Sequence, residues 1–359
     1  MPNYDFTSDW ADLSAVPDAA SSWAHNGLVV TASGELIGFH AGQLVAFDSE
    51  GRVLRVVRPG LTEGHGITLV REGDEEYLWI TDPGFIHVCT DGDGDEAWAP
   101  LFGKGVHVDS REPRVVKMTL RGEIRAELPI PPNDAATGPI MMGTYCPCGS
   151  AIDEERFGGN GDIWVADGYG SSLVHRFDKH GHHLSALSGE EGGGRFVCPH
   201  AVFIDRRAHK APELYIADRE NKRVQIYDLE GRYLRTIGEG FLSSPSGFVQ
   251  WGEALVVAEL YSRLAILDAD DKLVGYIGND PHAKDAQAWP ERPGWPNALT
   301  DDGHVQAPHL GDPERFNSPH SVAVDNDGNL FVSEWLVGGR YTKLAVPPRR
   351  SHQRRASVH

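Results

Sequence analysis

One pattern recurs along the chain: an apolar, aromatic-rich strand that ends in an acidic residue and is followed by a polar turn. It reads LWITD at 78–82, IWVAD at 163–167, LYIAD at 214–218, LVVAE at 255–259 and LFVSE at 330–334. A degenerate first copy, LIGFH at 36–40, has His40 in place of the acid. Six such copies predict a repeat architecture, because each repeat buries its apolar faces against its neighbours.

Most copies are followed by a third strand, a D-x-x-G turn and a fourth strand, as in VQIYDLEG at 224–231 and YLRTIG at 233–238. The 41 glycines and 23 prolines also favour many short strands joined by turns. Six units of four strands predict an all-β fold, a six-bladed β-propeller. The last unit, ending near 343–347, lacks a fourth strand, and we expect the N-terminal segment to supply it. We therefore expect one propeller domain over 1–347 and a basic, disordered tail over 348–359.

The net charge of the chain limits the classes of binding partner that we expect. The chain has 33 Lys and Arg against 52 Asp and Glu, a net charge of −19, which disfavours nucleic acid and anionic membranes. The sequence lacks an apolar run near the roughly 20 residues that cross a bilayer, and MPNYDFTSDWADLS does not read as a signal peptide. We expect a cytoplasmic protein with a small-molecule substrate, and the oligomeric state stays open.

Aligning the units on the strand-ending acid reveals one anchor position just upstream of each first strand. The six anchors, in chain order, are Asn26, His65, Cys148, His200, Ser246 and His320. Histidine thus occupies units two, four and six, in the frames GHGI, CPHAV and SPHSV. The first strand of each blade lines the axis, so alternate blades bring three imidazoles together from directions a third of a turn apart.

Three neutral imidazole nitrogens at about 2.0–2.1 Å with a fourth position open are typical of a catalytic zinc site. One such histidine alone would favour a hydrogen-bonded repeat residue, but three on alternate blades favour Zn²⁺ or another divalent metal. Cys148 is expected to be a passive small residue, with a thiol near the metal as the alternative. For His25 and His40, which border the anchors, we expect solvent exposure, with a supporting role beside the metal as the alternative.

Residues directly after the strand-ending acids should lie on the same face as the anchors. Tyr169 is a candidate base, and Arg219 a candidate cation for an anionic group. Tyr261 has the same offset from its acid as Tyr169 and competes for the base role, whereas Arg219 has the alternative of pairing with a neighbouring acid. Two long insertions, 91–113 and 279–315, are either lids over one face or surface excursions.

The stretch from about His65 to Pro347 resembles the NHL-repeat propeller of peptidyl-α-hydroxyglycine α-amidating lyase. The segments that carry the resemblance are ADGYGSSLVHRFDKHG at 166–181, CPHAVFID and LYIADRENKRVQIYD within 198–228, and SPHSVAVDNDGNLFVSE at 318–334. The resemblance implies zinc held by His65, His200 and His320, a catalytic tyrosine at Tyr169 and an active-site arginine at Arg219. It also implies cleavage of the C–N bond of a carbinolamine.

The chain departs from this family around the substrate. Ala41 stands where the family has an arginine in the first-blade turn. Ser321 stands where an aspartate helps to hold calcium in the family, so structural Ca²⁺ is not predicted. We expect a zinc-dependent lyase for a small α-hydroxylated, carbinolamine-like substrate that differs from the substrate of the amidating lyases. The alternatives are a metal-dependent lactone or ester hydrolase and a non-catalytic protein-binding platform.

Overall fold

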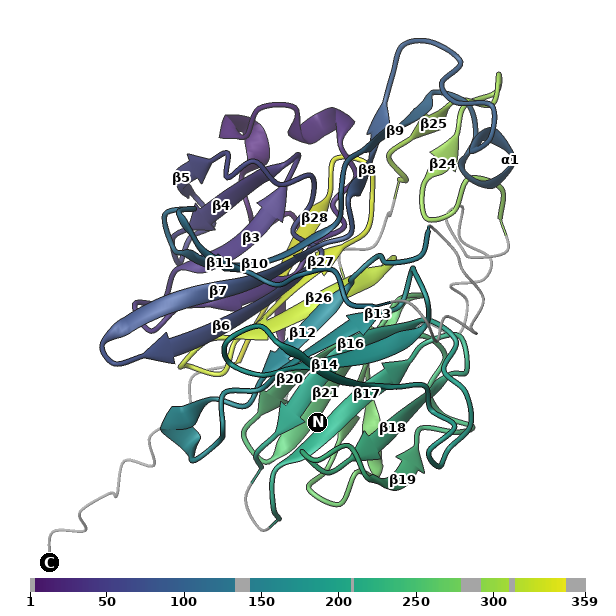
Figure 1. Cartoon of the computed structure of the whole chain (residues 1–359). Coiled ribbons are helices and arrows are strands. Elements are labelled where there is room, and N and C mark those ends of the chain that lie inside the picture. Colours follow the sequence, from purple (N-terminus) through teal and green to yellow (C-terminus); the bar gives the residue numbers. More distant parts are fainter. Residues whose placement is uncertain (1–3, 133–142, 208–209, 279–291, 310–313, 347–359) are drawn as a thin grey trace, which may run out of the picture.

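The computed structural model describes residues 4–132, 143–207, 210–278, 292–309 and 314–346. Six four-stranded antiparallel sheets form its body, and their inner strands contact one another in a closed ring (Figure 1). The predicted six-bladed β-propeller is therefore confirmed. The predicted tail, 348–359, lies outside the described residues.

The blades follow one another along the chain, and each runs from the axis outward. Blade one consists of β2 (Leu28–Val30), β3 (Leu36–His40), β4 (Gln43–Phe47) and β5 (Val53–Val57). Blade two consists of β6 (Gly66–Glu72), β7 (Glu75–Asp82), β10 (Arg114–Thr119) and β11 (Ile124–Glu127). Blade three consists of β12 (Gly149–Ile152), β13 (Ile163–Asp167), β14 (Leu173–Phe177) and β15 (His183–Leu187).

The second half repeats the scheme. Blade four consists of β16 (Pro199–Asp205), β17 (Glu213–Asp218), β18 (Arg223–Tyr227) and β19 (Tyr233–Ile237). Blade five consists of β20 (Pro245–Trp251), β21 (Ala254–Glu259), β22 (Arg263–Leu267) and β23 (Leu273–Ile277). Blade six consists of β26 (Pro319–Val324), β27 (Leu330–Glu334), β28 (Arg340–Ala345) and β1 (Asp5–Thr7).

Blade six joins the two ends of the chain. Strand β1 pairs antiparallel with β28, with Phe6 opposite Leu344, so the N-terminal segment supplies the missing outer strand as predicted. Phe6 also packs against Phe316, with ring centroids 6.0 Å apart. Closure by one N-terminal and three C-terminal strands leaves the ring without an open inter-blade face.

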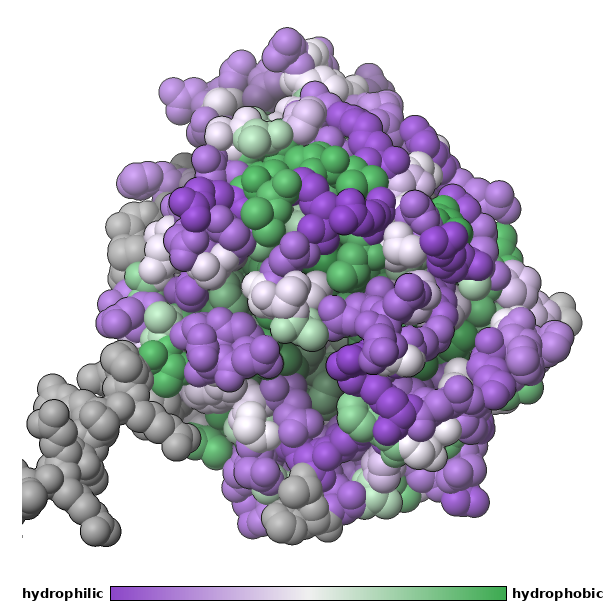
Figure 2. Space-filling view, turned by 90° about the vertical axis from the view of Figure 1, so that its left-hand side faces the viewer, coloured by the Kyte–Doolittle hydropathy of each residue, from purple (hydrophilic) through white to green (hydrophobic). Residues whose placement is uncertain are grey.

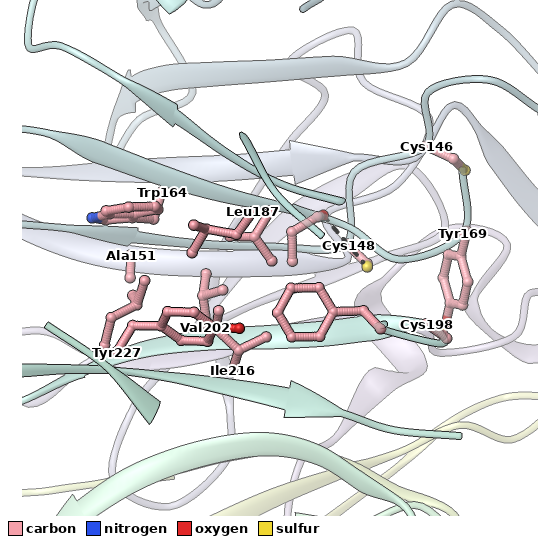
Figure 3. Close-up of a cluster of buried hydrophobic side chains, with 14 of the residues drawn as sticks. Cys146, Cys148, Ala151, Trp164, Tyr169, Leu187, Cys198, Val202, Ile216 and Tyr227 are labelled. Atoms are coloured by element: carbon pink, nitrogen blue, oxygen red, sulfur yellow. Dashed lines mark hydrogen bonds between the residues drawn. The ribbon is translucent and has the colours of Figure 1, made fainter. Parts of the chain in front are cut away.

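Apolar side chains fill the spaces between neighbouring blades. Figure 3 shows the cluster between blades three and four, in which Trp164, Leu187 and Tyr227 pack together and Tyr169 lies at one end. Because the strands of every blade alternate their side chains between two neighbours, each blade depends on both of its neighbours for burial.

The acid at the end of each second strand holds the loop that leads to the anchor of the same blade. Asp82, for example, accepts hydrogen bonds from the backbone N–H groups of Thr62 and Glu63 at 2.7 and 3.1 Å. The same contact joins four further pairs: Cys146 to Asp167, Val197 to Asp218, Ser243 to Glu259 and Asn317 to Glu334. The repeated acid therefore fixes where each anchor residue enters the axis.

Two insertions lie together at one end of the propeller (Figure 1). Between β7 and β10 lie β8 (Phe85–Cys89), α1 (Ala99–Phe102) and β9 (Val106–Ser110), and before β26 lie β24 (Ala298–Leu299) and β25 (Val305–Gln306). A bridge between Lys104 and His304 connects them.

Short 3-10 turns occur at η1 (Leu13–Ala15), η2 (Ala19–Ser21) and η3 (Glu155–Phe157). Among the described residues, none of the helices has the length and hydropathy to cross a bilayer.

The inner strands approach closely at the anchor level. A Cβ added to Gly66 would lie 2.6 Å from Thr81 Oγ1, 2.7 Å from the Cys148 carbonyl oxygen and 2.9 Å from the Gly149 Cα. Two of these three atoms belong to the backbone of blade three, which cannot move without displacing its neighbours. Glycine is therefore needed where blades two and three meet the axis.

We expect Gly66→Ala to lower the free energy of unfolding by about 1–3 kcal/mol, the usual cost of overpacking. Gly92→Ala is the matched control, because nothing lies within 4 Å of its added Cβ and its φ is not positive. Chemical denaturation followed by circular dichroism measures both. Equal midpoints for the two variants would contradict the close-approach argument.

Candidate metal centre

The structure brings the three predicted histidines together at the axis. His65 directly precedes β6, His200 lies in β16 and His320 lies in β26, and each side chain is buried. Their ring centroids lie 4.5–5.0 Å apart. Alternate blades thus present three imidazoles to one point.

The backbone of the intervening blades holds each of these rings. Nδ1 of His65 lies 2.6 Å from the carbonyl oxygen of Cys148, and Nδ1 of His200 lies 2.8 Å from that of Ser246. Nδ1 of His320 lies 3.1 Å from the carbonyl oxygen of Asn26. A carbonyl oxygen only accepts, so Nδ1 carries the proton and Nε2 presents a lone pair to the centre.

This arrangement gathers more lone pairs than donors. Nε2 of His320 lies 3.1 Å from Nε2 of His65, and neither atom carries a proton to share. The hydroxyl of Tyr169 lies 3.2 Å from Nε2 of His65 and 2.9 Å from Nε2 of His200, but it has one proton. Buried lone pairs that converge without donors fit a divalent cation, and two ligands of a tetrahedral zinc ion would lie about 3.3 Å apart.

A fourth imidazole, His25, lies in the same group, so the expectation that it is exposed to solvent was wrong. Its Nε2 lies 3.1 Å from the Tyr169 hydroxyl, and its Nδ1 lies 3.2 Å from Oε2 of Glu63. Sequence reasoning missed Glu63 entirely. For His25 the sequence did offer a signal: the residue before the anchor is histidine in unit one, but proline or glycine in the other units.

Tyr169 extends from the core between blades three and four to the histidines. Its ring lies beside Cys146 and Cys198 at the end of that core (Figure 3). Gly168 before it is required, because an added Cβ would lie 2.4 Å from the Pro199 carbonyl oxygen. The buried, well-packed ring therefore fixes the hydroxyl at the centre of the site.

Arg219 approaches the same hydroxyl from blade four. Its NH1 donates to Tyr169 Oη at 3.1 Å, and its guanidinium lies 5.3 Å from the centroid of the tyrosine ring. Its Nε also pairs with Glu220 at 2.9 Å, which is one of the pairings that the sequence left open. Arg219 is buried, so its charge acts on the phenol in a poorly screened environment.

Tyr261 does not share this position. It is half-buried, and it packs edge-on against Trp295 with ring centroids 5.8 Å apart. Trp295 in turn contacts Trp335, whose ring lies 5.2 Å from that of His25. Phe102 of the other insertion also contacts Trp335, with ring centroids 6.0 Å apart. The described parts of both insertions therefore pack against Trp335 at the rim; residues 279–291 and 310–313 lie outside the described residues.

Burial is the main cause of the pKa shifts of the histidines, Tyr169 and Glu63 in the site. It lowers the pKa of His65 and His200 well below the usual value and that of His320 to about 3, so all three are neutral near pH 7. Burial also raises the pKa of the Tyr169 phenol, and the charge of Arg219 opposes that shift. Burial and the nearby Asp82 raise the pKa of Glu63.

Cys148, His40 and His182, the other residues singled out in the sequence, lie outside the group of four histidines. The Cys148 thiol lies 3.4 Å from the Pro199 carbonyl oxygen and outside the group of four histidines, which fits a passive small residue. His40 is buried rather than exposed, and its Nε2 lies 3.1 Å from the carbonyl oxygen of Ala19. It thus occupies the place of the strand-ending acid and holds the N-terminal segment. His182 is exposed beside Asp178.

A cavity of about 640 Å³ runs along the inner strands and reaches His65, His200 and His320 from the side opposite the insertions. Inner strands from all six blades line it. Figure 2 looks onto the face at which the β6–β7 hairpin ends, where hydrophobic residues lie around a hollow near the middle. The histidines therefore close one end of an axial channel.

Comparisons with known proteins agree with this architecture. No family model matches the chain. NHL repeat-containing protein 3 of Homo sapiens is 27% identical over 251 residues, covering 67% of this chain and 62% of that protein. The probable peptidyl-alpha-hydroxyglycine alpha-amidating lyase pgal-1 of Caenorhabditis elegans is 26% identical over 278 residues, covering 75% of this chain and 60% of that protein.

The chain thus has homologues among NHL-repeat proteins, as its motifs predicted, and it spans about three fifths of the length of these relatives. Among solved structures, a streptogramin B lyase is similar with a TM-score of 0.55 at 13% identity, covering 96% of this chain and 98% of that one. At this identity, the likeness supports the fold.

His40 makes the stability of the fold sensitive to acid. Burial lowers its pKa from 6.5 to about 4, so the unfolded chain binds the proton more readily than the folded one. Its contribution is complete above pH 6.5 and is lost as the pH falls toward 4, by about 3 kcal/mol in all. We expect His40→Gln, which keeps an N–H for the Ala19 carbonyl, to flatten urea midpoints across this range.

The control for this prediction is His182→Gln, because His182 is exposed. This variant should follow the wild-type pH profile. A His40→Gln profile that falls as steeply as that of the wild type would assign the acid sensitivity to other groups.

Proposed function

We propose that the protein is a zinc-dependent lyase that cleaves a small α-hydroxylated, carbinolamine-like substrate. One observation carries the proposal: three buried imidazole lone pairs converge beside a tyrosine hydroxyl that also contacts a buried arginine. The distant homology to a protein named as an amidating lyase supports a propeller enzyme of the lyase kind.

His65, His200 and His320 would hold the metal through Nε2, the atom that faces the centre. A divalent ion there supplies a Lewis acid, which lowers the pKa of a substrate hydroxyl. The carbonyl groups of Cys148, Ser246 and Asn26 orient the rings, as partners of metal-binding histidines commonly do.

Tyr169 acts as the general base in this proposal. Its phenolate oxygen accepts the proton of the substrate hydroxyl, the electron pair of that O–H bond forms the second bond of the carbonyl group, and the C–N pair leaves with the nitrogen. The nitrogen then takes that proton back from the Tyr169 hydroxyl, so the products are a carbonyl compound and an amide or amine, and the phenolate is restored. Arg219 supports this role, because a guanidinium 3.1 Å from the phenol oxygen favours its ionised form.

The substrate is small and carries an anionic group in this proposal. Arg219 can turn a second N–H toward a carboxylate, since its fork binds planar anions well. The first-blade turn offers Ala41 in place of a charged side chain, and His40 beside it is engaged with Ala19. We therefore propose a substrate other than a peptidyl-α-hydroxyglycine.

Purified protein should contain about one zinc ion per chain, removable by chelator, because three neutral imidazoles form the site. Metal analysis should find this content sharply reduced in His200→Ala. His182→Ala is the control, because that imidazole is exposed and directly precedes β15, the outermost strand of blade three. Full metal content and affinity in His200→Ala would overturn the metal centre.

Tyr169→Phe should keep its fold and metal but lose about 10²–10⁴-fold in turnover, the typical contribution of a general base. An N-acyl-α-hydroxyglycine is a suitable first probe, with carbonyl product measured at matched metal occupancy. Tyr261→Phe is the matched control, because Tyr261 has the same offset but packs on Trp295. Loss of turnover in Tyr261→Phe alone would move the base to blade five.

The same assay in ¹⁸O-labelled water separates elimination from hydrolysis. Initial product from a lyase takes no oxygen from water, whereas a hydrolase incorporates the label in each turnover. Near-normal turnover in both tyrosine variants together with label incorporation would favour the hydrolase.

A further inference from the structure

The N-terminal segment crosses the rim between blades two and six before it enters blade one. Trp23 N–H donates to the carbonyl of His87, and Ala24 N–H donates to that of Leu336. Gly27 N–H donates to the carbonyl of Gly64, one residue before His65. His25 is thus carried by backbone that is fixed on both sides.

This placement puts the His25 ring among the histidines of the site. Its centroid lies 4.3 Å from that of His65 and 4.6 Å from that of His320, as close as the three predicted ligands lie to one another, at 4.5–5.0 Å. One nitrogen of each of the four rings lies within 4.8 Å of the others. His87, by contrast, is a buried imidazole of the same rim that lies outside the group.

Glu63 gives His25 an oxygen partner at Nδ1, the place that a backbone carbonyl oxygen takes for the other three rings. Its Oε2 lies 3.2 Å from His25 Nδ1, but the two atoms lack the alignment of a hydrogen bond, and neither has another partner among the described residues. Both side chains are buried, and an unpaired buried polar group destabilises the fold. Nε2 of His25 already faces the centre, 3.1 Å from the Tyr169 hydroxyl, and a small rotation that aligns Nδ1–H with the carboxylate would remove that destabilisation.

We propose that His25 is a fourth protein ligand of the metal centre, held in place by Glu63. The inference rests on the proposed metal centre and extends it. Four imidazole nitrogens with a carboxylate behind one of them suit zinc, cobalt, nickel or copper rather than calcium or magnesium, which prefer oxygen. Zinc also accepts a fifth ligand, so a fourth imidazole leaves access for a substrate oxygen.

The proposal couples the metal to ring closure. Residues 5–7 form the outer strand of blade six, and His25 follows on the same N-terminal segment. An ion bound by His25, His65 and His320 therefore links that segment to blades two and six. Metal binding should then protect backbone amides in 22–27 from hydrogen exchange.

Titration of chelator-treated full-length protein with Co²⁺ tests the proposal, because the visible spectrum of Co²⁺ reports the number and kind of its ligands. We expect His25→Gln to change this spectrum and to weaken Co²⁺ binding more than Glu63→Gln does. Loss of an outer partner typically weakens metal binding about 10–100-fold, which is the range expected for Glu63→Gln. His87→Gln, the matched control, should keep the wild-type spectrum and affinity.

A wild-type spectrum and affinity in folded His25→Gln would overturn the fourth ligand. If that variant fails to fold, His25→Gly with added imidazole replaces it, and recovery of the spectrum by imidazole alone supports the proposal. Unchanged exchange of 22–27 on adding Co²⁺ to the wild type would contradict the coupling to ring closure.

These outcomes are distinguishable from failure of the proposed function. Protein that binds Co²⁺ with the expected His25 dependence but turns over no substrate would refute the lyase and keep the fourth ligand. Protein that binds no Co²⁺ at all would overturn both.

Discussion

The hydrogen bonds from each anchor loop to the acid at the end of the second strand are the contacts on which the site depends. In blades two to six a buried carboxylate accepts a backbone N–H two or three residues before the anchor. A buried carboxylate must find donors, and the loop amides supply one or more of them in each of these blades. Equivalent anchors therefore reach the axis at one level, which allows three histidines to meet.

The non-histidine anchors serve the histidines through their backbone. Cys148, Ser246 and Asn26 each offer a carbonyl to the Nδ1 of a neighbouring ring. This sets the tautomer, so the lone pairs point inward toward one another, an arrangement that could hold a metal ion. Alternation along the chain thus becomes a division of labour, with three blades supplying nitrogen atoms and three supplying the carbonyl groups that orient them.

The N-terminal segment serves both fold and site. It completes blade six, it is held by His40 where the other blades have an acid, and it places His25 beside His65. His40 replaces the acid in the first repeat because its partner there is the carbonyl of Ala19, which needs a hydrogen-bond donor rather than an acceptor. The aromatic rim formed around Trp335 covers this segment and borders the histidines.

The sequence alone determined the propeller and the alternate histidines, because strand patterns, acids and anchors are local features that repeat at a fixed spacing. It could not choose between Tyr169 and Tyr261, which have the same offset; in the structure Tyr261 packs on Trp295, whereas the Tyr169 hydroxyl contacts His65 and His200. It also gave no sign of Glu63 and suggested exposure for His25 and His40. The positions of these three side chains depend on where the N-terminal segment crosses between the blades. That crossing is set only when the ring closes, so the sequence pattern does not contain it.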